Sequence, residues 1–404
     1  MNILFISDVY FPRINGVSTS IKTFRDRFTQ AGHRVVLIAP DYGNNGDDDN
    51  DIIRIPSRRI IFDHEDRLMC KDAIKQRASD LKQIKFDLVH IQTPFIAHTM
   101  GVYLSRLLNI PRLETYHTFF EEYFYHYIPL VPKKLLRHLA RRFTSKQCNN
   151  IHHIITPSSA MQDILKSYGV TTAITVLPTG IDTEQFSNGN GARFREKHNI
   201  RQDRPVLTHI GRVAHEKNID FLIKMLTHVW QEIPDILLLI AGEGPAVNKL
   251  KRLSVRLGLK DNVLFVGYQD RLTELNDCYS CGDAFVFASR TETQGLVLLE
   301  SMSLGIPVVS TAIMGTRDIL GAGMGALVAD EHERQFAIKV IKLLNNEILR
   351  KRLGAEGRQY VQAWSADTMA FHMLDLYQTL CKPSETQTEH TVIQPLYTTS
   401  ATQD

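Results

Sequence analysis

Short apolar segments alternate with helical segments along this chain, and the alternation occurs in two series. A continuous apolar run such as Ile3–Ser7 is typical of a parallel strand buried on both faces. The first series has further expected strands at 35–39, 88–91, 112–115, 151–156 and 174–177, with helices at about 17–31, 68–83, 95–108, 133–148 and 158–168. The second series has expected strands beginning near 206 and at 236–241, 263–266, 284–288, 308–310 and 326–328, with helices at 331–346 and 348–364. The pattern predicts two doubly wound α/β domains.

The length of 404 residues also favours two domains. We expect an N-terminal domain at 1–182 and a C-terminal domain at 205–365. The polar segment 183–204, rich in Asn, Gly and Arg, is interpreted as the interdomain connection. A last helix at 366–381 is expected to pack back on the N-terminal domain. The tail 382–404 is rich in Thr, Gln and Ser, and we expect it to be disordered.

Bulk composition excludes several classes of protein. The net charge is only +3, so global charge gives no case for nucleic-acid binding. The longest apolar runs have the length of a strand and are far short of a membrane span. The start of the chain lacks the pattern of a signal peptide, and five cysteines do not suggest a disulfide framework. A cytoplasmic location is therefore expected.

Cys278 and Cys281 form a C-x-x-C motif that needs a choice between two interpretations. They could be a redox pair or half of a metal site. However, the sequence has no second pair to complete a zinc site, and the segment 272–281 has helical periodicity. We interpret the two thiols as small apolar groups packed in a core.

Glu292 and Glu300 bracket a segment whose context predicts strand, tight loop, helix and strand. Glu292 would lie in the loop, and Glu300 on the helix about one and a half turns beyond Gly295. Gly295 would let the backbone approach a ligand, and the helix start would offer free N–H groups to phosphates. The two carboxylates could then hold two hydroxyl-bearing parts of that ligand. Two solvated surface glutamates are the alternative, because this spacing alone is common by chance.

Gly16 and Val17 follow the first expected strand at the start of a helix. Gly16 would let the main chain approach a pyrophosphate, with N–H donors from the helix start. An ordinary turn glycine is the alternative. No G-x-G-x-x-G is present here, and Gly242-x-Gly244 lacks the third glycine, so a nicotinamide-dependent dehydrogenase is poorly supported.

Four motifs together resemble the family 4 retaining glycosyltransferases of GT-B fold, over roughly residues 1–380. They are Asn15-Gly16-Val17, Gly211-Arg212 with Glu216-Lys217, Ala241-Gly-Glu-Gly-Pro245 and Glu292-x7-Glu300. The resemblance implies two facing Rossmann-like domains with the active site in the cleft between them. A shorter match, Thr115-Tyr-His117-Thr followed by Glu121, Glu122 and Tyr123, is similar to bacterial enzymes that glycosylate diacylglycerol.

The resemblance implies roles for residues of the C-terminal domain. Arg212 and Lys217 would bind the diphosphate of a nucleotide sugar and stabilise the charge that develops as it leaves. Glu300 would hold the ribose hydroxyls and Glu292 would face the donor sugar. Backbone N–H groups near Gln294, Gly295, Leu296 and Val297 would also bind the sugar and the phosphates of the donor. Solvated surface cations are the alternative for Arg212 and Lys217.

In the N-terminal domain, the resemblance places His117 near the transferred sugar and the reaction centre. Its position just after an expected strand supports this role more than for His90, His152 or His153, which we interpret as structural. Glu121 and Glu122 would orient an acceptor hydroxyl, or else be solvated loop carboxylates. Retention in this family is usually explained by front-face attack, and no catalytic metal or cofactor is implied. The Asp-x-Asp of the acidic run 46–51 is interpreted as a solvated loop.

A basic helix expected at 133–146 follows an aromatic segment at 116–127. Leu135, Leu136, Leu139 and Phe143 would form one apolar face, with the cations mostly elsewhere. An apolar entry beside such a helix suits an enzyme that takes a lipid acceptor from an anionic bilayer. A core-facing helix with solvated cations is the alternative.

The leading hypothesis from sequence is therefore an enzyme that moves a hexose from a nucleotide sugar, UDP-linked by preference, to a diacylglycerol-type lipid. It would act at the inner face of the cytoplasmic membrane. A GDP-mannose-dependent or polysaccharide-building transferase with another acceptor is the second hypothesis. A non-catalytic nucleotide-sugar or lipid-binding module is the third, and the presence of Arg212, Lys217 and Glu300 argues against it.

Overall fold

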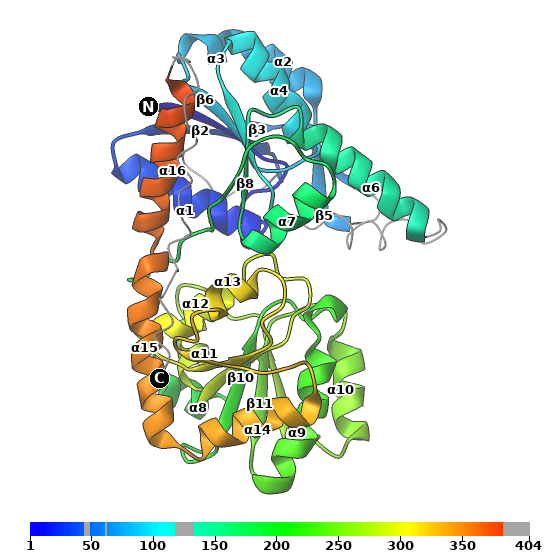
Figure 1. Cartoon of the computed structure of the whole chain (residues 1–404), viewed down its shortest axis with the longest axis vertical. Coiled ribbons are helices and arrows are strands. Elements are labelled where there is room, and N and C mark those ends of the chain that lie inside the picture. The colour runs from blue at the N-terminus through cyan, green and yellow to red at the C-terminus, as the bar shows by residue number, and fades with distance from the viewer. Residues whose placement is uncertain (44–48, 61–62, 118–132, 383–404) are drawn as a thin grey trace. The chain divides into compact units, whose positions relative to one another are not determined.

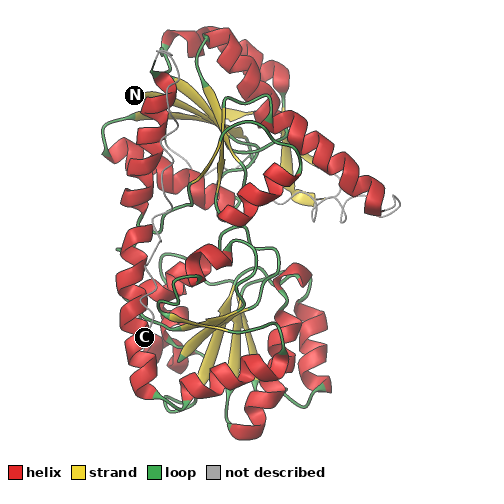
Figure 2. Ribbon diagram, viewed as in Figure 1, coloured by secondary structure: helices red, strands yellow, loops and turns green. Residues whose placement is uncertain are grey.

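The computed structural model describes the chain except for residues 44–48, 61–62, 118–132 and 383–404. The chain divides into two compact units, one made of residues 1–180 and 366–404 and the other of 181–365 (Figure 1). Each unit has a sheet of parallel strands with helices on both faces (Figure 2). The predicted pair of doubly wound α/β domains is confirmed. The tail expected to be disordered lies, apart from Lys382, outside the described residues.

The sheet of the first unit has the strand order β3-β2-β1-β6-β7-β8-β9. Its strands are β1 (Asn2–Ile6), β2 (Arg34–Pro40), β3 (Ile52–Ile55), β6 (Leu88–Ile91), β7 (Arg112–Thr115), β8 (His153–Thr156) and β9 (Ile174–Val176), beside a small antiparallel pair, β4 (Ser57–Ile60) and β5 (Asp63–Met69). Its helices are α1 (Gly16–Gln30), α2 (Lys71–Gln76), α3 (Ala78–Gln83), α4 (Ile96–Leu108), α6 (Lys133–Cys148), α7 (Ser159–Ser167) and α16 (Ala366–Cys381).

Helix α16 packs on the first unit although it comes from the far end of the chain. It lies beside α1, and Met369, Met373 and Tyr377 join the core that covers one face of the sheet (Figure 1). The Tyr377 hydroxyl lies 2.5 Å from Nδ1 of His90, and Nε2 of His90 lies 2.7 Å from the Thr115 hydroxyl. The last helix is thereby joined to strands β6 and β7, and both ring nitrogens of His90 are used within the fold.

The sheet of the second unit has the order β12-β11-β10-β13-β14-β15. Its strands are β10 (Val206–Ile210), β11 (Leu237–Ala241), β12 (Val263–Gly267), β13 (Ala284–Phe287), β14 (Val308–Ser310) and β15 (Ala326–Val328). Its helical segments are α8 (Gly191–Lys197), η1 (His215–Lys217), α9 (Ile219–Glu232), α10 (Val247–Arg256), α11 (Leu275–Ser280), α12 (Leu296–Ser303), α13 (Thr316–Leu320), α14 (Glu333–Leu344), α15 (Glu347–Val361) and η2 (Gln362–Trp364).

Strand β11 shows why these apolar runs form buried parallel strands. Leu238 and Ile240 enter the core on one face of the sheet, while Leu237, Leu239 and Ala241 enter the core on the other. Because side chains alternate along a strand, both faces need apolar residues, so the whole run is apolar.

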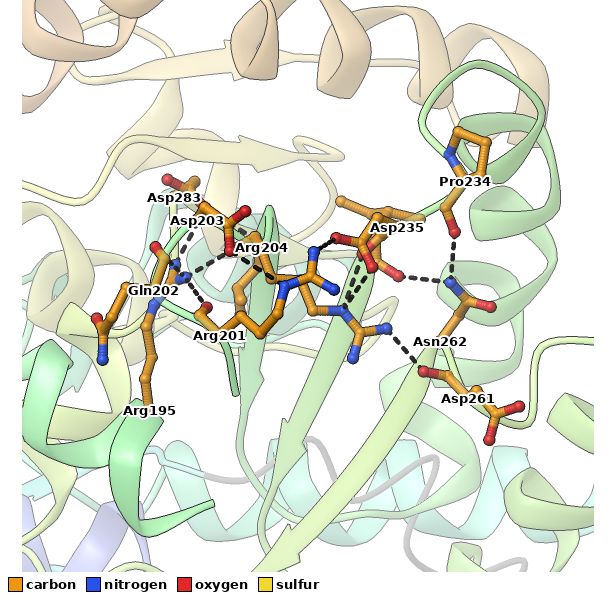
Figure 3. A network of polar contacts seen from close by, with 12 residues as sticks. Arg195, Arg201, Gln202, Asp203, Arg204, Pro234, Asp235, Asp261, Asn262 and Asp283 are labelled. Atoms are coloured by element: carbon orange, nitrogen blue, oxygen red, sulfur yellow. Dashed lines mark hydrogen bonds and ion pairs between the residues drawn. The ribbon is translucent and has the colours of Figure 1, made fainter. Parts of the chain in front are cut away.

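The segment 183–204, predicted to be an interdomain connection, is instead folded into the second unit. Arg195, on α8, is buried and donates to the carbonyl oxygens of Cys281 and Arg204, at 2.9 and 2.7 Å. It also pairs with Asp283 at 3.3 Å, and Figure 3 shows the surrounding network of arginines and aspartates. The polar composition of this segment therefore supplies hydrogen bonds within a folded unit rather than solubility for a linker.

Two expectations for the first unit were also wrong in detail. The helix expected at 68–83 begins only after β5 and is divided into α2 and α3. Strands β3, β4 and β5 were not predicted, since an arginine interrupts the apolar run of β3 and most residues of β4 and β5 are polar.

Candidate functional site

The predicted site residues of the second unit follow strands that meet at one point of the sheet. Arg212 and Lys217 come after β10, and Glu292 comes after β13. Strands β10 and β13 are neighbours, and the strand order reverses direction between them. The carboxyl ends of parallel strands at such a reversal form the usual ligand-binding edge of a doubly wound sheet.

Two glycines let the loop after β11 pack directly on the loop after β10. A Cβ on Gly242 would lie 1.9 Å from the Gly211 carbonyl oxygen, and one on Gly244 would lie 2.4 Å from that of Val213. Both glycines also have positive φ angles, +131° and +154°. In addition, Val213 donates its N–H to the Glu243 carbonyl at 2.8 Å. These contacts fix the course of the chain on either side of Arg212.

Lys217 and Glu292 form an ion pair, with 2.5 Å between Nζ and Oε2. Both side chains are about one-fifth exposed, so the pair remains accessible to solvent. Arg212 is exposed, and within the described residues its guanidinium has no hydrogen bond or ion pair. Within the described residues, this edge of the sheet thus has two different cations. Arg212 is unpaired, and Lys217 is paired with the solvent-accessible carboxylate of Glu292.

Asn218 and Glu331 join the two loops that carry this ion pair. The side-chain amide of Asn218 donates to the Ala288 carbonyl and to Oε1 of Glu331, each at 3.1 Å. Glu331 also accepts from Nε of Arg290 at 2.7 Å. Since Asn218 follows Lys217 and Arg290 precedes Glu292 by two positions, these bonds hold both loops in place. Asn218 is buried and has φ +57°, a left-handed conformation that asparagine tolerates.

Gly295 begins helix α12 with φ +104°, which favours glycine. A Cβ there would lie 3.1 Å from Cγ2 of Thr316. No side chain caps the helix start, so the N–H groups of Leu296 and Val297 remain available to an anion. Gln294, just before Gly295, is buried. The predicted loop and helix around Gly295 are therefore present, with the N–H groups that the prediction needs.

Glu300 is buried on α12 and is held by two donors. Arg271 Nη2 lies 2.7 Å from Oε1, and the Tyr279 hydroxyl lies 2.7 Å from Oε2. Glu300 raises the pKa of the Arg271 guanidinium, while burial raises the pKa of the Tyr279 hydroxyl. Sequence reasoning missed both partners. Arg271 and Tyr279 stand in the sequence as polar residues, but nothing in their spacing indicates that they would contact Glu300.

Two further polar atoms lie buried at the same edge. Within the described residues, Oγ of Ser289 and Oγ1 of Thr311 have no hydrogen-bond partner. Ser289 follows β13 by two positions, and Thr311 directly follows β14. Buried polar groups are normally hydrogen-bonded, so this edge of the sheet has polar groups free for a ligand.

In the first unit, Gly16 and Val17 open helix α1, as expected. The Asn15 side chain caps that helix by accepting the Ser18 N–H at 2.9 Å. A Cβ on Gly16 would meet nothing within 4 Å, so there is open space beside its backbone. The position is compatible with a ligand close to the main chain.

Asp8 was missed by sequence reasoning and organises the neighbouring loop. This buried carboxylate accepts from the Thr93 hydroxyl at 2.8 Å and from the N–H of Ala97 at 3.1 Å. Burial raises the pKa of Asp8 to about 6. Asp8 follows β1 and Thr93 follows β6, so it joins the two strands at which the order of the first sheet reverses.

His117 lies just after β7 and is half-buried. Its Nε2 lies 3.1 Å from Oε1 of Gln92, at the end of β6. Burial lowers the pKa of His117 to about 4, so the ring is neutral at pH 7. With the Gln92 oxygen as acceptor, Nε2 carries the hydrogen and Nδ1 can accept a hydrogen bond. A neutral ring can position a hydroxyl group but adds no positive charge.

The other histidines near strand ends bond within the fold. His153 Nε2 lies 2.8 Å from the Thr175 hydroxyl, and His152 Nδ1 accepts the Arg112 N–H at 3.2 Å. His98 and Glu114, which the sequence did not single out, form a buried pair with 2.7 Å between Nδ1 and Oε2. These side chains have structural partners.

The predicted acceptor-side residues Glu121, Glu122 and Tyr123 lie outside the described residues, as does most of the aromatic segment 116–127.

Helix α6 buries one face and exposes three of the four residues of the predicted apolar face. Leu136, Ala140, Thr144 and Cys148 are buried at intervals of four residues. Leu135, Leu139 and Phe143 are exposed, at 51%, 53% and 41%. The expected apolar face is therefore wrong only in including Leu136, which packs inward while the other three residues are exposed. Arg137, Arg142 and Lys146 are exposed on the same helix. None of the described helices is long and apolar enough to cross a membrane.

The thiols of Cys278 and Cys281 are buried, and Cys281 Sγ lies 3.1 Å from the Cys278 carbonyl oxygen. Burial raises the pKa of both thiols, as expected for packed groups. In the described part of the chain, no cluster of His, Cys, Asp or Glu is arranged to hold a metal ion.

Two family models match the chain. One, described as Glycosyltransferase Family 4, matches residues 14–185, and the other, Glycosyl transferases group 1, matches residues 191–360. An alpha-monoglucosyldiacylglycerol synthase of Streptococcus pneumoniae is 33% identical over 84% of this chain and 77% of its own length. A protein of the same name from Acholeplasma laidlawii is 26% identical over 76% of this chain and 80% of its own.

A solved structure of Anabaena HepE in complex with UDP has a similar fold. The TM-score is 0.76, and the match covers 94% of this chain and all of that one, at 16% identity. At this identity the similarity concerns the fold alone.

Proposed function

Because this chain belongs to the family 4 glycosyltransferases, which are retaining enzymes of the GT-B fold, we propose that it transfers a hexose from a nucleotide sugar to a lipid hydroxyl. The single observation that carries the proposal is the arrangement at the reversal point of the second sheet. There Lys217 pairs with Glu292, beside the uncapped start of α12. This arrangement supports a donor site for a phosphorylated, hydroxyl-rich ligand.

The diphosphate of the donor would be bound by cations and by backbone donors. Arg212 can grip two phosphate oxygens at once, while Lys217 acts as a point charge. The N–H groups of Leu296 and Val297 add donors at the positive end of a helix dipole. The exposure of Arg212 supports this role, since a cation without a protein partner is available to an anion.

The carboxylates would hold the hydroxyl-bearing parts of the donor. Glu300 would accept hydrogen bonds from the ribose and Glu292 from the sugar. Lys217 would have two partners in turn. Before the donor binds, Lys217 pairs with Glu292, and once the donor is bound Lys217 would contact the diphosphate.

The reaction breaks the bond between the sugar's anomeric carbon and the diphosphate oxygen. The acceptor oxygen forms the new bond on the same face of the sugar, and its proton passes to the departing phosphate. Negative charge grows on the diphosphate as the bond breaks, so Arg212 and Lys217 stabilise the transition state more than the ground state. His117, as a neutral ring, would position a sugar or acceptor hydroxyl without transferring charge.

The proposed acceptor is a diacylglycerol-type lipid. The activity named for the two curated relatives supports this choice, and so does α6. Leu135, Leu139 and Phe143 form an exposed apolar stripe on a helix that also carries exposed cations. Such a helix suits binding in the plane of an anionic membrane surface. The enzyme would then act as a peripheral protein at the cytoplasmic face.

The test is a transfer assay with purified full-length protein. UDP-glucose, UDP-galactose and GDP-mannose would each be incubated with and without mixed vesicles of phosphatidylglycerol and diacylglycerol. We expect release of UDP and formation of a glycosyl-diacylglycerol with a UDP-sugar. If product forms only with GDP-mannose, the proposed UDP-linked donor is wrong. If the donor is turned over but no glycolipid forms, the proposed lipid acceptor is wrong. No turnover of any donor would contradict the proposed function.

A further inference from the structure

Each oxygen of the Glu300 carboxylate has its own protein donor. Arg271, in the loop after β12, donates to Oε1, and Tyr279, on α11, donates to Oε2, both at 2.7 Å. Glu300 is only 4% exposed and Tyr279 is fully buried. A buried carboxylate is costly unless it is paired and hydrogen-bonded, so these two donors are what allow Glu300 to lie there as an anion.

The two donors leave the carboxylate half occupied. An ionised carboxylate has about four acceptor positions, two on each oxygen. With one position on each oxygen taken, one position on each remains. Two neighbouring acceptors on a rigid carboxylate match two neighbouring hydroxyl groups, such as the 2′ and 3′ hydroxyls of a ribose.

We propose that Tyr279 and Arg271 are positioning residues that fix the Glu300 carboxylate so that it reads the 2′,3′-diol of the donor. They thereby make the enzyme select ribonucleoside over 2′-deoxyribonucleoside diphosphate sugars. This inference rests on the proposed function, in which Glu300 binds the donor ribose. It adds the residues that orient Glu300 and the substrate feature that their geometry distinguishes.

The two residues contribute in different ways. The Tyr279 ring packs against Phe285, with ring centroids 5.5 Å apart, so its hydroxyl points at Glu300 from a fixed position. Arg271 supplies the opposite charge, and its guanidinium lies 5.6 Å from the Phe186 ring centroid. A contact of this kind helps to hold a long side chain in one direction. The tyrosine thus fixes the plane of the carboxylate, while the arginine neutralises it.

A 2′-deoxy donor would lose one of the two hydrogen bonds. The matching carboxylate acceptor would then be buried without a partner when the donor is bound. Sites built to bind a substrate hydroxyl discriminate strongly against analogues that lack it, for this reason. We expect the wild-type enzyme to prefer the ribose form by roughly tenfold or more, since hydrogen bonds to charged groups are the stronger ones.

The experiment compares UDP-glucose with 2′-deoxy-UDP-glucose in the wild type and in Tyr279→Phe. The variant keeps the aromatic ring and removes only the hydroxyl. We expect kcat/KM for UDP-glucose to fall, mainly through KM, while the value for the 2′-deoxy donor changes little. The preference for ribose should then shrink several-fold. Equal losses with both donors would indicate a merely structural role and would overturn the proposal.

Two further variants sharpen the test. Arg271→Lys keeps the charge but loses the planar fork, so it should lower the preference for ribose while leaving the protein folded. Tyr360→Phe is the matched control, because the Tyr360 hydroxyl is not bonded to Glu300. It should leave the preference unchanged. Thermal unfolding of each variant would show whether the fold is intact.

Binding separates this proposal from the proposed function. Calorimetric titration of the full chain with UDP and with 2′-deoxy-UDP needs no sugar transfer and no acceptor. Equal affinities for the two nucleotides would overturn the role of Tyr279 and Arg271 even if the enzyme transfers glucose. Failure to bind either nucleotide would instead contradict the donor site on which both proposals rest.

Discussion

The amine of Lys217 lies 2.5 Å from a carboxylate oxygen of Glu292, although 75 positions separate them in the chain. The pair joins the loop after β10 to the loop after β13, at the reversal point of the second sheet. Neither side chain is fully buried, so the ion pair can be exchanged for a ligand. Because Lys217 and Glu292 neutralise each other, neither of these two side chains carries an unpaired charge before a ligand binds.

Removing either cation should mainly reduce turnover. We expect Arg212→Ala and Lys217→Ala each to lower kcat by roughly a hundredfold or more, because each would stabilise the departing diphosphate. Steady-state kinetics with saturating donor would measure the effect. Lys224→Ala is the control, since this exposed lysine on α9 pairs with Asp220 at the surface. Near-normal kcat in both site variants would remove them from this role.

Asn218 should matter for the site although it need not contact the donor. Asn218→Ala would remove the donor to the Ala288 carbonyl and one of the donors to Glu331, which would keep only Arg290, and it would place a less suitable residue at φ +57°. We expect a loss of roughly 1–3 kcal/mol in stability and a lower kcat. Asn218→Gly relieves the backbone strain but not the lost bonds. If Asn218→Gly restored both stability and kcat, the side-chain bonds to Ala288 and Glu331 would have no role.

His209 should make the second unit sensitive to acid. Its ring is buried beside Phe287, and Nδ1 lies 3.1 Å from the Val286 carbonyl oxygen. Burial lowers the pKa of His209 to about 4, from its ordinary value of 6.5. Between these values the unfolded chain binds the proton and the folded chain does not. The contribution of His209 to stability is therefore complete above pH 6.5 and is lost as the pH falls toward 4, by at most about 1.4 kcal/mol per pH unit.

Thermal unfolding at pH 7, 6, 5 and 4.5 would measure this dependence. His209→Phe keeps an aromatic ring in place and removes the titrating group, so its midpoint should fall less on acidification than that of the wild type. Substitution of the exposed His332 by Gln serves as the control. Identical acid sensitivity in the wild type and His209→Phe would rule out this effect of burial.

The exposed stripe of α6 should bind anionic membranes. Leu139→Glu places a negative charge between Leu135 and Phe143 and should strongly reduce sedimentation with phosphatidylglycerol vesicles at low salt. High salt should weaken binding of the wild type, because the cations of the helix contribute through screened electrostatic attraction. Ile348→Glu makes the same change at another exposed apolar residue, on α15, and should have little effect. Wild-type protein that stays in solution with such vesicles at low salt would end this proposal.

The sequence by itself determined which segments form the central strands of the two sheets. Runs such as 236–241 and 284–288 are apolar at every position, and only a strand buried on both faces requires this. The loops that carry Lys217 and Glu292 could be placed for the same reason, since each follows such a run. A local pattern is sufficient here because the strand period and the turn residues are properties of neighbouring positions.

Tertiary structure decided which side chains meet. Nothing local indicates that Tyr279 would bond Glu300 or that Arg195 would fold a polar segment into the second unit, because those contacts depend on how separate elements pack. The same limit explains why the sequence did not show which residues of α6 are buried. Its sequence offers one stripe through Leu136 and another through Leu139, and helical periodicity alone does not say which of them faces the core. Packing selects the stripe with the smaller residues, Ala140 and Thr144, because it lets the helix approach the rest of the unit closely.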